Sequence, residues 1–192
     1  MEVNELNIVV YCGASAGSQL AYQQAAVELG NWLAAAGHTL VYGGSKIGLM
    51  GTLADTVLAA GGQAIGVLPT FLKDKEIAHP KLTALYVVET MAERKQKMLA
   101  LSDACLALPG GVGTLEEIIE AISWARVGQN DRPCIFFDAA DYYQTLRLFF
   151  DQMVTEEFLS ASDRAQIYFA GSTAEIERLI AAFYESKMRN SL

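Results

Sequence analysis

Residues 104–117 read ACLALPGGVGTLEE, and this stretch decides the fold of the chain. The apolar run at its start is typical of a buried strand, and Pro109 ends the run because proline cannot continue a central strand. Three glycines occupy the next four positions, so the backbone there can turn tightly and approach a ligand closely. Apolar residues then recur at helical spacing over 114–127. A strand, a glycine turn and a helix start direct backbone N–H groups and the positive end of the helix dipole at an anion, and we expect phosphate.

Short apolar runs alternate with helical patterns along the whole chain. The runs predict strands over 6–12, 38–42, 63–68, 84–88, 104–108, 134–137 and 167–170. The periodic segments predict helices over 20–36, with Ser18 as N-cap, and over 49–60, 91–101, 114–127, 142–154 and 173–188. Residues 70–82 are irregular and predict a surface loop. Because parallel strands need crossover connections, the alternation indicates an α/β fold, a doubly wound parallel sheet with helices on both faces. Residues 1–192 fit one domain.

The composition limits the classes of partner. Hydrophobic residues make up 52% and charged residues 19% of the 192 residues, as in a globular chain. The net charge of −8 argues against nucleic acid or an anionic membrane as partner. The three cysteines have no disulfide or metal-ligand spacing, so we expect buried thiols in a reducing compartment, the cytoplasm, and no metal site.

Two further loops of small residues follow predicted strands, at 13–18 and 43–48. In parallel sheets such loops meet at the carboxyl edge, so we expect them to share one site with 109–113. None of the three has the spacing of a standard nucleotide-binding fingerprint. The glycines at 43–44 and 110–114 therefore have two interpretations, an anion cradle or a place where a helix packs closely on a strand.

Charged residues flank the expected cradle on two helices. Glu116, Glu117 and Glu120 follow the glycines, where acids either interact with the helix dipole and water or take part in chemistry. Arg94 lies near the start of the preceding helix and offers a planar fork for phosphate, with a solvated basic face as the alternative.

Four segments together resemble the LOG ("Lonely guy") family. The segment PGGVGTLEE at 109–117 resembles its PGGxGTxxE motif, and MAERK at 91–95 resembles its MxxRK segment. YCGAS at 11–15 and YGG with GLMG at 42–51 resemble its two earlier loops. The resemblance covers residues from about 6 to about 155, and the order of the motifs makes it specific.

This resemblance implies a Rossmann-like fold, a homodimer and hydrolysis of the N-glycosidic bond of a nucleoside 5′-monophosphate. Arg94 and Glu117 match the family's catalytic pair. The phosphate-holding turn corresponds to Gly110, Gly111, Val112, Gly113 and Thr114. Further substrate-lining positions correspond to Ser15, Gly43, Gly44, Lys95, Glu116 and Ser123. Glu76 resembles the family's loop glutamate.

The implied substrate is a cytokinin riboside 5′-monophosphate or AMP, and the products are an adenine-type base and ribose 5-phosphate. No cofactor or metal is required by this scheme, and nothing in the sequence suggests the pyridoxal-phosphate site of a lysine decarboxylase, a label often given to the family. Two alternatives stay open. One is a plain AMP nucleosidase, and the other is a non-catalytic carrier of a nucleotide or of molybdenum cofactor on the same fold.

Overall fold

The computed structural model describes residues 5–73 and 77–190. The described chain forms one seven-stranded sheet in the order β4-β3-β2-β1-β5-β6-β7, and every neighbouring pair is parallel. The strands are β1 (Asn7–Tyr11), β2 (Thr39–Tyr42), β3 (Gln63–Pro69), β4 (Ala84–Val88), β5 (Ala104–Ala107), β6 (Cys134–Phe137) and β7 (Ile167–Ala170). The parallel α/β sheet predicted from the alternating pattern is confirmed.

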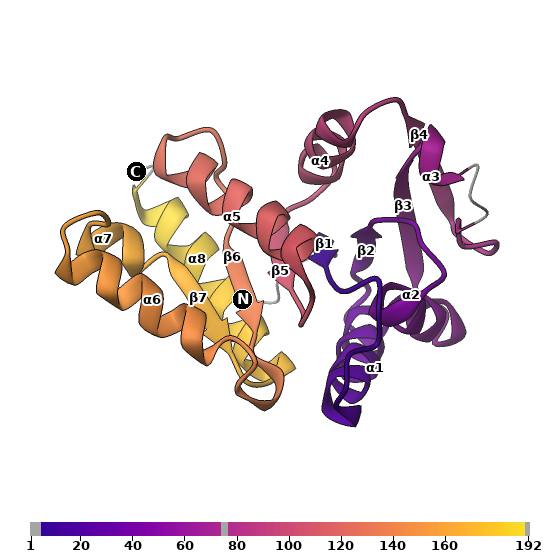
Figure 1. The fold of residues 1–192 in the computed structure, drawn as a ribbon, viewed down its shortest axis with the longest axis horizontal. Coiled ribbons are helices and arrows are strands. Elements are labelled where there is room, and N and C mark those ends of the chain that lie inside the picture. Colours follow the sequence, from indigo (N-terminus) through magenta and orange to yellow (C-terminus); the bar gives the residue numbers. More distant parts are fainter. Residues whose placement is uncertain (1–4, 74–76, 191–192) are drawn as a thin grey trace.

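Helices cover both faces of this sheet (Figure 1). They are α1 (Leu20–Ala35), α2 (Gly48–Ala59), α3 (Thr70–Lys73), α4 (Met91–Ala100), α5 (Val112–Arg126), α6 (Gln144–Thr155), α7 (Ala161–Arg164) and α8 (Thr173–Asn190), with a 3₁₀ turn at Ala139–Asp141. One core cluster lies beneath α1, α2 and α8, and the other beneath α4, α5 and α6. Within β1, Ile8 and Val10 face the first cluster, whereas Val9 and Tyr11 face the second. This alternation explains why the strands are apolar throughout.

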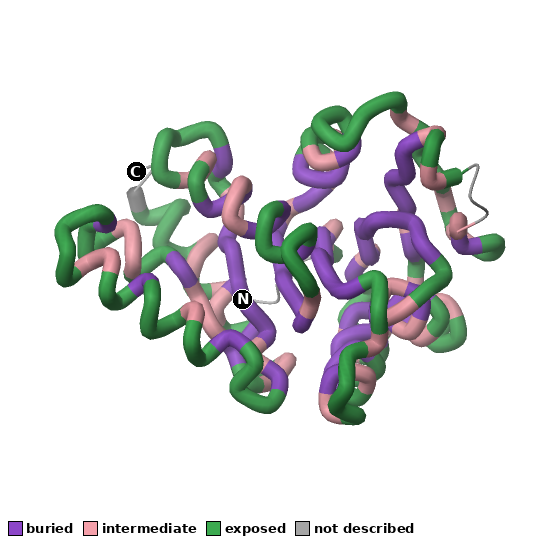
Figure 2. Tube along the Cα trace, in the orientation of Figure 1, coloured by how far each residue is buried: buried purple, intermediate pink, exposed green. Residues whose placement is uncertain are grey.

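The central strands are the most deeply buried part of the molecule (Figure 2). The chain runs outward from β1 to β4 and then returns to pair β5 with the other side of β1. The loops after β1 and β5 therefore diverge from a topological switch point, the usual position of a ligand site in such sheets. No helix among the described residues has the length and apolar character needed to cross a membrane.

Three local predictions differ from the structure. Ser18 is not the N-cap of α1, because that helix begins at Leu20 and Gln19 takes the position without a side-chain bond. Helix α5 begins at Val112, two residues earlier than the apolar spacing predicts, so Gly113 and Thr114 lie in its first turn. The stretch 70–82 is not entirely a surface loop, because it contains helix α3 and a buried His79. The ring Nε2 of His79 pairs with Asp55 at 3.1 Å, and its backbone N–H donates to Gly44 O.

Candidate active site

A cavity of about 430 Å³ opens at the carboxyl edge of the sheet, within the usual range for small-molecule sites. Its lining comes from the end of β1, from the loops after β1, β2 and β5, and from α2, α4 and α5. The lining residues are Val10, Tyr11, Cys12, Gly13, Ala14, Ser15, Gly43, Met50, Arg94, Met98, Gly111, Gly113, Thr114 and Glu117. The three small-residue loops therefore meet at one site, as the sequence predicts.

The start of α5 forms one wall of this cavity. Gly111 is the N-cap, and its carbonyl accepts the N–H of Leu115 at 3.1 Å. The first N–H groups of an α-helix have no partners within the helix, so this end offers donors to an anion. A Cβ on Gly111 or Gly113 would meet no described atom within 4 Å, whereas one on Gly110 would lie 2.1 Å from Thr114 Oγ1. Gly110 is therefore needed for close packing, whereas Gly111 and Gly113 leave their backbone uncovered.

A buried ion pair between α4 and α5 also lines the cavity. Arg94 Nη1 donates to Glu117 Oε1 at 2.6 Å, and each side chain is 9% exposed. Arg94 Nε also donates to the carbonyl of Val67 in β3 at 3.1 Å, so the guanidinium is held from two sides. A Cβ on Gly43 would lie 2.0 Å from Arg94 Nη2. Gly43 therefore leaves the space that the guanidinium occupies.

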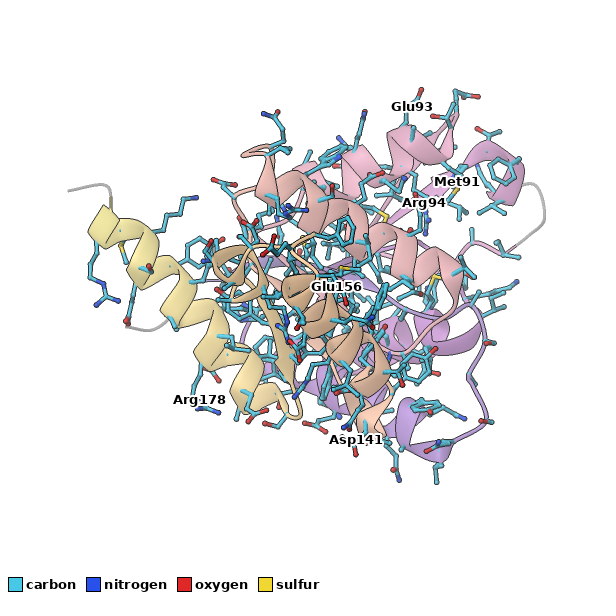
Figure 3. All side chains as sticks on the ribbon, turned by 60° about the vertical axis from the view of Figure 1, so that its left-hand side comes forward. Met91, Glu93, Arg94, Asp141, Glu156 and Arg178 are labelled. Carbon is cyan, nitrogen blue, oxygen red and sulfur yellow. The ribbon has the colours of Figure 1, made fainter. Side chains whose placement is uncertain are left out.

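The first turn of α4 sets the direction of Arg94. Thr90 caps the helix by accepting the N–H of Glu93 at 3.1 Å, and Glu93 Oε2 accepts the N–H of Glu89 at 2.9 Å. These contacts fix the helix start, in a variant of the capping box in which the N3 glutamate accepts from the residue before the N-cap. Glu93 consequently points outward, while its neighbour Arg94 points into the molecule (Figure 3). The solvated basic face considered for Arg94 is wrong, because this side chain is buried.

Burial controls the protonation of the cavity's acids. Desolvation raises the pKa of Glu117, and the adjacent Arg94 opposes that rise. Desolvation and the nearby Glu117 also raise the pKa of the Cys12 thiol. Because the thiolate is the reactive form of cysteine, Cys12 stays an unreactive, protonated part of the lining.

A second charged cluster lies beside the cavity, outside its lining. Lys95 Nζ bonds to Glu116 and, at 2.7 Å, to Glu120, so α4 and α5 are joined side by side. These hydrogen bonds raise the pKa of Lys95. Ser123 is exposed and lies seven residues after Glu116, on the same face of α5.

The structure separates the candidate residues into two groups. It brings Ser15, Gly43, Arg94, Gly111, Gly113, Thr114 and Glu117 together around the cavity. The lining leaves out Gly44, Lys95, Gly110, Val112, Glu116 and Ser123. Glu76 lies outside the described residues. Sequence reasoning did not single out Met50 and Met98, whose helical apolar spacing marks them as core residues. Within the described residues there is no cluster of three or more side chains suited to hold a metal ion.

Comparison with known proteins gives the family. A family model described as "Possible lysine decarboxylase" matches residues 50–180. The cytokinin riboside 5′-monophosphate phosphoribohydrolase LOG1 of Arabidopsis thaliana is 43% identical over 169 residues, covering 88% of this chain and 79% of that protein. The chain belongs to the LOG family. A bacterial LOG relative, the cytokinin riboside 5′-monophosphate phosphoribohydrolase of Rhodococcoides fascians, is 40% identical over 92% of this chain and 88% of that protein.

The LOG-family chain also shares its fold with solved structures of lower identity. The molybdenum cofactor carrier protein of Chlamydomonas reinhardtii superposes with a TM-score of 0.70 at 21% identity, over 95% of this chain and 99% of that one. The molybdenum cofactor binding protein of Rippkaea orientalis gives 0.68 at 22% identity, over 93% and 97%. At this identity the likeness shows a common Rossmann-like fold.

Proposed function

We propose that this chain hydrolyses the N-glycosidic bond of a cytokinin riboside 5′-monophosphate and releases the free base and ribose 5-phosphate. The observation that carries the proposal is the buried Arg94–Glu117 pair, which lines one cavity together with the amide-rich start of α5. Such an arrangement provides separate places for an anion and for the reacting sugar. Relatives at about 40% identity that bear the name of this activity support the same conclusion.

In this proposal the phosphate lies at the first turn of α5, against the uncovered backbone of Gly111 and Gly113 and the hydroxyl of Thr114. The helix dipole and unpaired N–H groups stabilise its charge, and holding the phosphate fixes the position of the ribose. We assign Ser15 to the opposite loop of the same cavity. Six further family-matched positions support this lining from outside it in our proposal: Gly44, Lys95, Gly110, Val112, Glu116 and Ser123. Glu76, outside the described residues, stays a candidate on the resemblance alone.

Glu117 acts on the sugar. Cleavage of the bond to the base leaves positive charge on the ribose ring, and a carboxylate stabilises that charge. Arg94 contacts Oε1 of Glu117, which leaves Oε2 for a ribose hydroxyl or for the attacking water. Water adds its oxygen to the anomeric carbon, and the base leaves with the bonding electrons and a proton. Arg94 also balances the charge of Glu117, so the carboxylate does not repel the phosphate.

The lysine decarboxylase in the family model's description does not suit this cavity. A pyridoxal-phosphate enzyme holds its cofactor through a lysine Schiff base. The charged side chains in the described lining are Arg94 and Glu117, and the lining contains no lysine. We therefore propose a hydrolase that needs neither this cofactor nor a metal.

The decisive experiment is incubation of the purified protein with an N6-prenylated adenosine 5′-monophosphate and, separately, with AMP. Chromatography of the free base and of ribose 5-phosphate measures the reaction. Preference for the prenylated nucleotide supports the proposal, and equal turnover of both would indicate a general AMP nucleosidase. Release of no base, with molybdenum cofactor retained on the protein, would contradict hydrolysis and indicate a carrier.

We further propose that two copies of the chain associate. Several apolar side chains on the edge strand β4 and at the starts of α4 and α5 are exposed, among them Tyr86, Val87, Met91 and Val112. An exposed apolar surface of this kind favours contact with another protein surface. Light scattering should give twice the monomer mass, and a monomeric mass at micromolar concentration would contradict the dimer.

The buried free thiols of Cys12, Cys105 and Cys134 support a location in the reducing cytoplasm.

A further inference from the structure

The turn between β6 and α6 has an unusual backbone for the residues that it contains. Ala140 and Asp141 have consecutive positive φ angles of 53° and 57°, which residues other than glycine rarely adopt. Asp138 fixes the turn, because its N–H donates to Ala170 O at 2.8 Å and its Oδ1 accepts the N–H of Tyr143 at 2.6 Å. Asp141 itself lies on the outer surface (Figure 3). Strain of this kind persists where the surrounding structure holds it and is common near functional sites.

The strained turn directs two consecutive tyrosines at the glycine loop after β5. Tyr143 Oη donates to the carbonyl of Leu108 at 2.7 Å, and Tyr142 Oη donates to the carbonyl of Gly110. The ring of Tyr143 packs edge-on against Phe136 at 4.8 Å, and the ring of Tyr142 packs edge-on against Tyr22 at 5.4 Å. Each ring therefore packs against a second aromatic ring, Tyr143 as a buried residue and Tyr142 at the surface, where it is 41% exposed.

Three successive carbonyls of the loop are consequently bound. The N–H of Gly13 donates to Pro109 O at 3.1 Å, between the carbonyls of Leu108 and Gly110 that the tyrosines bind. A peptide unit is rigid and planar, and in its trans form the N–H points away from the C=O. Binding the carbonyl of Gly110 thus also fixes the direction of the Gly111 N–H, on the side opposite Tyr142. Gly111 lines the cavity, whereas neither tyrosine does.

We propose that Tyr142 and Tyr143 are positioning residues for the phosphate cradle: by binding the carbonyls of Gly110 and Leu108, they hold the glycine loop in the orientation that presents its N–H groups to the phosphate. This inference rests on the proposed function, because it takes a phosphate ester as the ligand of the loop. Neither hydroxyl contacts the cavity, so both act through the backbone. The strained turn is the device that places the two tyrosines on the loop.

The test compares two substitutions that each remove one tyrosine hydroxyl from a backbone carbonyl. Tyr142→Phe removes the bond to Gly110, and Tyr184→Phe is the matched control. Tyr184 Oη donates to Asp103 O at 2.7 Å, and Asp103 immediately precedes β5, at the opposite edge of the sheet from the cavity. For each variant we would measure kcat and KM with the nucleotide, the inhibition constant of ribose 5-phosphate and the melting temperature.

We expect Tyr142→Phe to raise both KM and the inhibition constant about tenfold, with kcat changed less than about twofold, because one positioning bond of ordinary strength is lost. Tyr184→Phe should leave all three constants at the wild-type values. Tyr143→Phe should shift KM in the same direction and also lower the melting temperature, because it leaves a buried carbonyl without its donor. A purely structural role would lower the melting temperature without a selective loss of phosphate affinity.

The outcomes separate this inference from the proposed function. If the wild type is active and Tyr142→Phe matches Tyr184→Phe in KM, or loses kcat alone, the positioning role is overturned and the hydrolase stands. If the wild type releases no base from any nucleotide, the proposed hydrolysis fails. Calorimetric titration with ribose 5-phosphate then decides the inference: weaker binding by Tyr142→Phe supports it, and equal or absent binding overturns it.

Discussion

Glu117 is the residue on which the proposed reaction depends most directly. Its carboxylate is buried against Arg94, so complete removal of one partner would leave an uncompensated buried charge, at a cost of about 3–5 kcal/mol. Glu117→Gln reduces this difficulty without removing it: the amide oxygen still accepts from Arg94 Nη1, but the positive charge of Arg94 is no longer balanced. We expect this variant to fold with a lower melting temperature than the wild type and to lose at least ~10²-fold in kcat, the range of groups that act directly in catalysis.

Release of free base from a nucleoside monophosphate measures this effect. Glu120→Gln is the matched control, since it makes the same chemical change one turn further along α5, outside the cavity lining. We expect a much smaller loss for the control. Near-wild-type turnover by Glu117→Gln would show that the carboxylate takes no part in the reaction.

Burial of Glu117 also predicts the pH dependence of the reaction. Because desolvation raises its pKa above the ordinary carboxyl value, the reactive carboxylate forms only at higher pH than for an exposed glutamate. The acid limb of kcat/KM should therefore lie above about pH 4.3 and be absent from the residual activity of Glu117→Gln. A limb at or below that pH would contradict the assignment.

The stability effect of this group has the opposite sign to that of an exposed ion pair. The folded state binds the proton of Glu117 more tightly than the unfolded state does. Its contribution to the free energy of unfolding is thus fully present below the unfolded pKa, and it is lost as the pH rises through the folded pKa. The pair is retained at a cost in stability at neutral pH, as expected for a functional site.

The residue pattern predicted which helix turns carry the charged site residues, and only the resemblance to the LOG family distinguished Arg94 and Glu117 from their neighbours. Arg94 and Lys95 are adjacent, as are Glu116 and Glu117, yet only one of each pair lines the cavity. One residue along a helix is a rotation of about 100°, and a mostly polar turn gives no apolar stripe to fix that rotation. The direction follows from contacts distant in sequence, such as the space at Gly43 and the carbonyl of Val67.

At the scale of elements, the loop before α5 makes a prediction about the cradle. A side chain at Gly111 would meet no described atom within 4 Å, and the φ angle of −90° suits any residue. Gly111→Val should therefore fold with a nearly unchanged melting temperature, yet place methyl groups where the phosphate would lie. We expect KM to rise at least ~10-fold, because the variant blocks close approach of the backbone to the ligand. An unchanged KM in steady-state assays would place the phosphate elsewhere.

The loop after β2 makes a different prediction, because its glycine packs against a side chain. In Gly43→Ala the added methyl would lie 2.0 Å from Arg94 Nη2 in the present geometry, so the guanidinium must leave the position in which it bonds to Glu117. A displacement of about 1 Å can reduce the rate ~10²-fold, and we expect a loss of that order in kcat. Gly171→Ala in the β7–α8 connection is the control for an added methyl, since its φ is not positive and a Cβ there makes only an ordinary contact of 3.6 Å with Glu175 Oε2. Equal kcat values for the two variants would contradict this role of Gly43.

Apolar periodicity predicted most elements to within two residues, and the remaining differences have local causes. The first turn of α5 contains Val112 and Gly113, which add no buried stripe, so periodicity alone placed the start at Thr114. The buried position of His79 depends on a pair with Asp55, 24 residues earlier. The tyrosines of the β6–α6 turn gave no signal at all, because their partners are backbone carbonyls more than 30 residues away.

At the scale of the whole molecule, one continuous sheet carries both hydrophobic clusters. Successive residues of β1 face alternate clusters, and β1 pairs with β2 on one side and with β5 on the other. Neither half of the sheet therefore has a core that is independent of the central strands. This connection supports the proposal that residues 1–192 fold as a single domain.

Such a domain should unfold in one cooperative transition, with equal calorimetric and van't Hoff enthalpies. Saturation with ribose 5-phosphate offers a stricter test, because a ligand that binds only the folded state stabilises everything that unfolds with its site. At a ligand concentration of about 100 Kd the stabilisation is roughly 2.7 kcal/mol. In a single domain the most protected amides exchange only when the whole chain unfolds. Exchange at such amides should then slow by the same factor in β1 and in the distant strand β7. Protection confined to the cavity side, with exchange in β7 unchanged, would show that the chain unfolds in two independent parts.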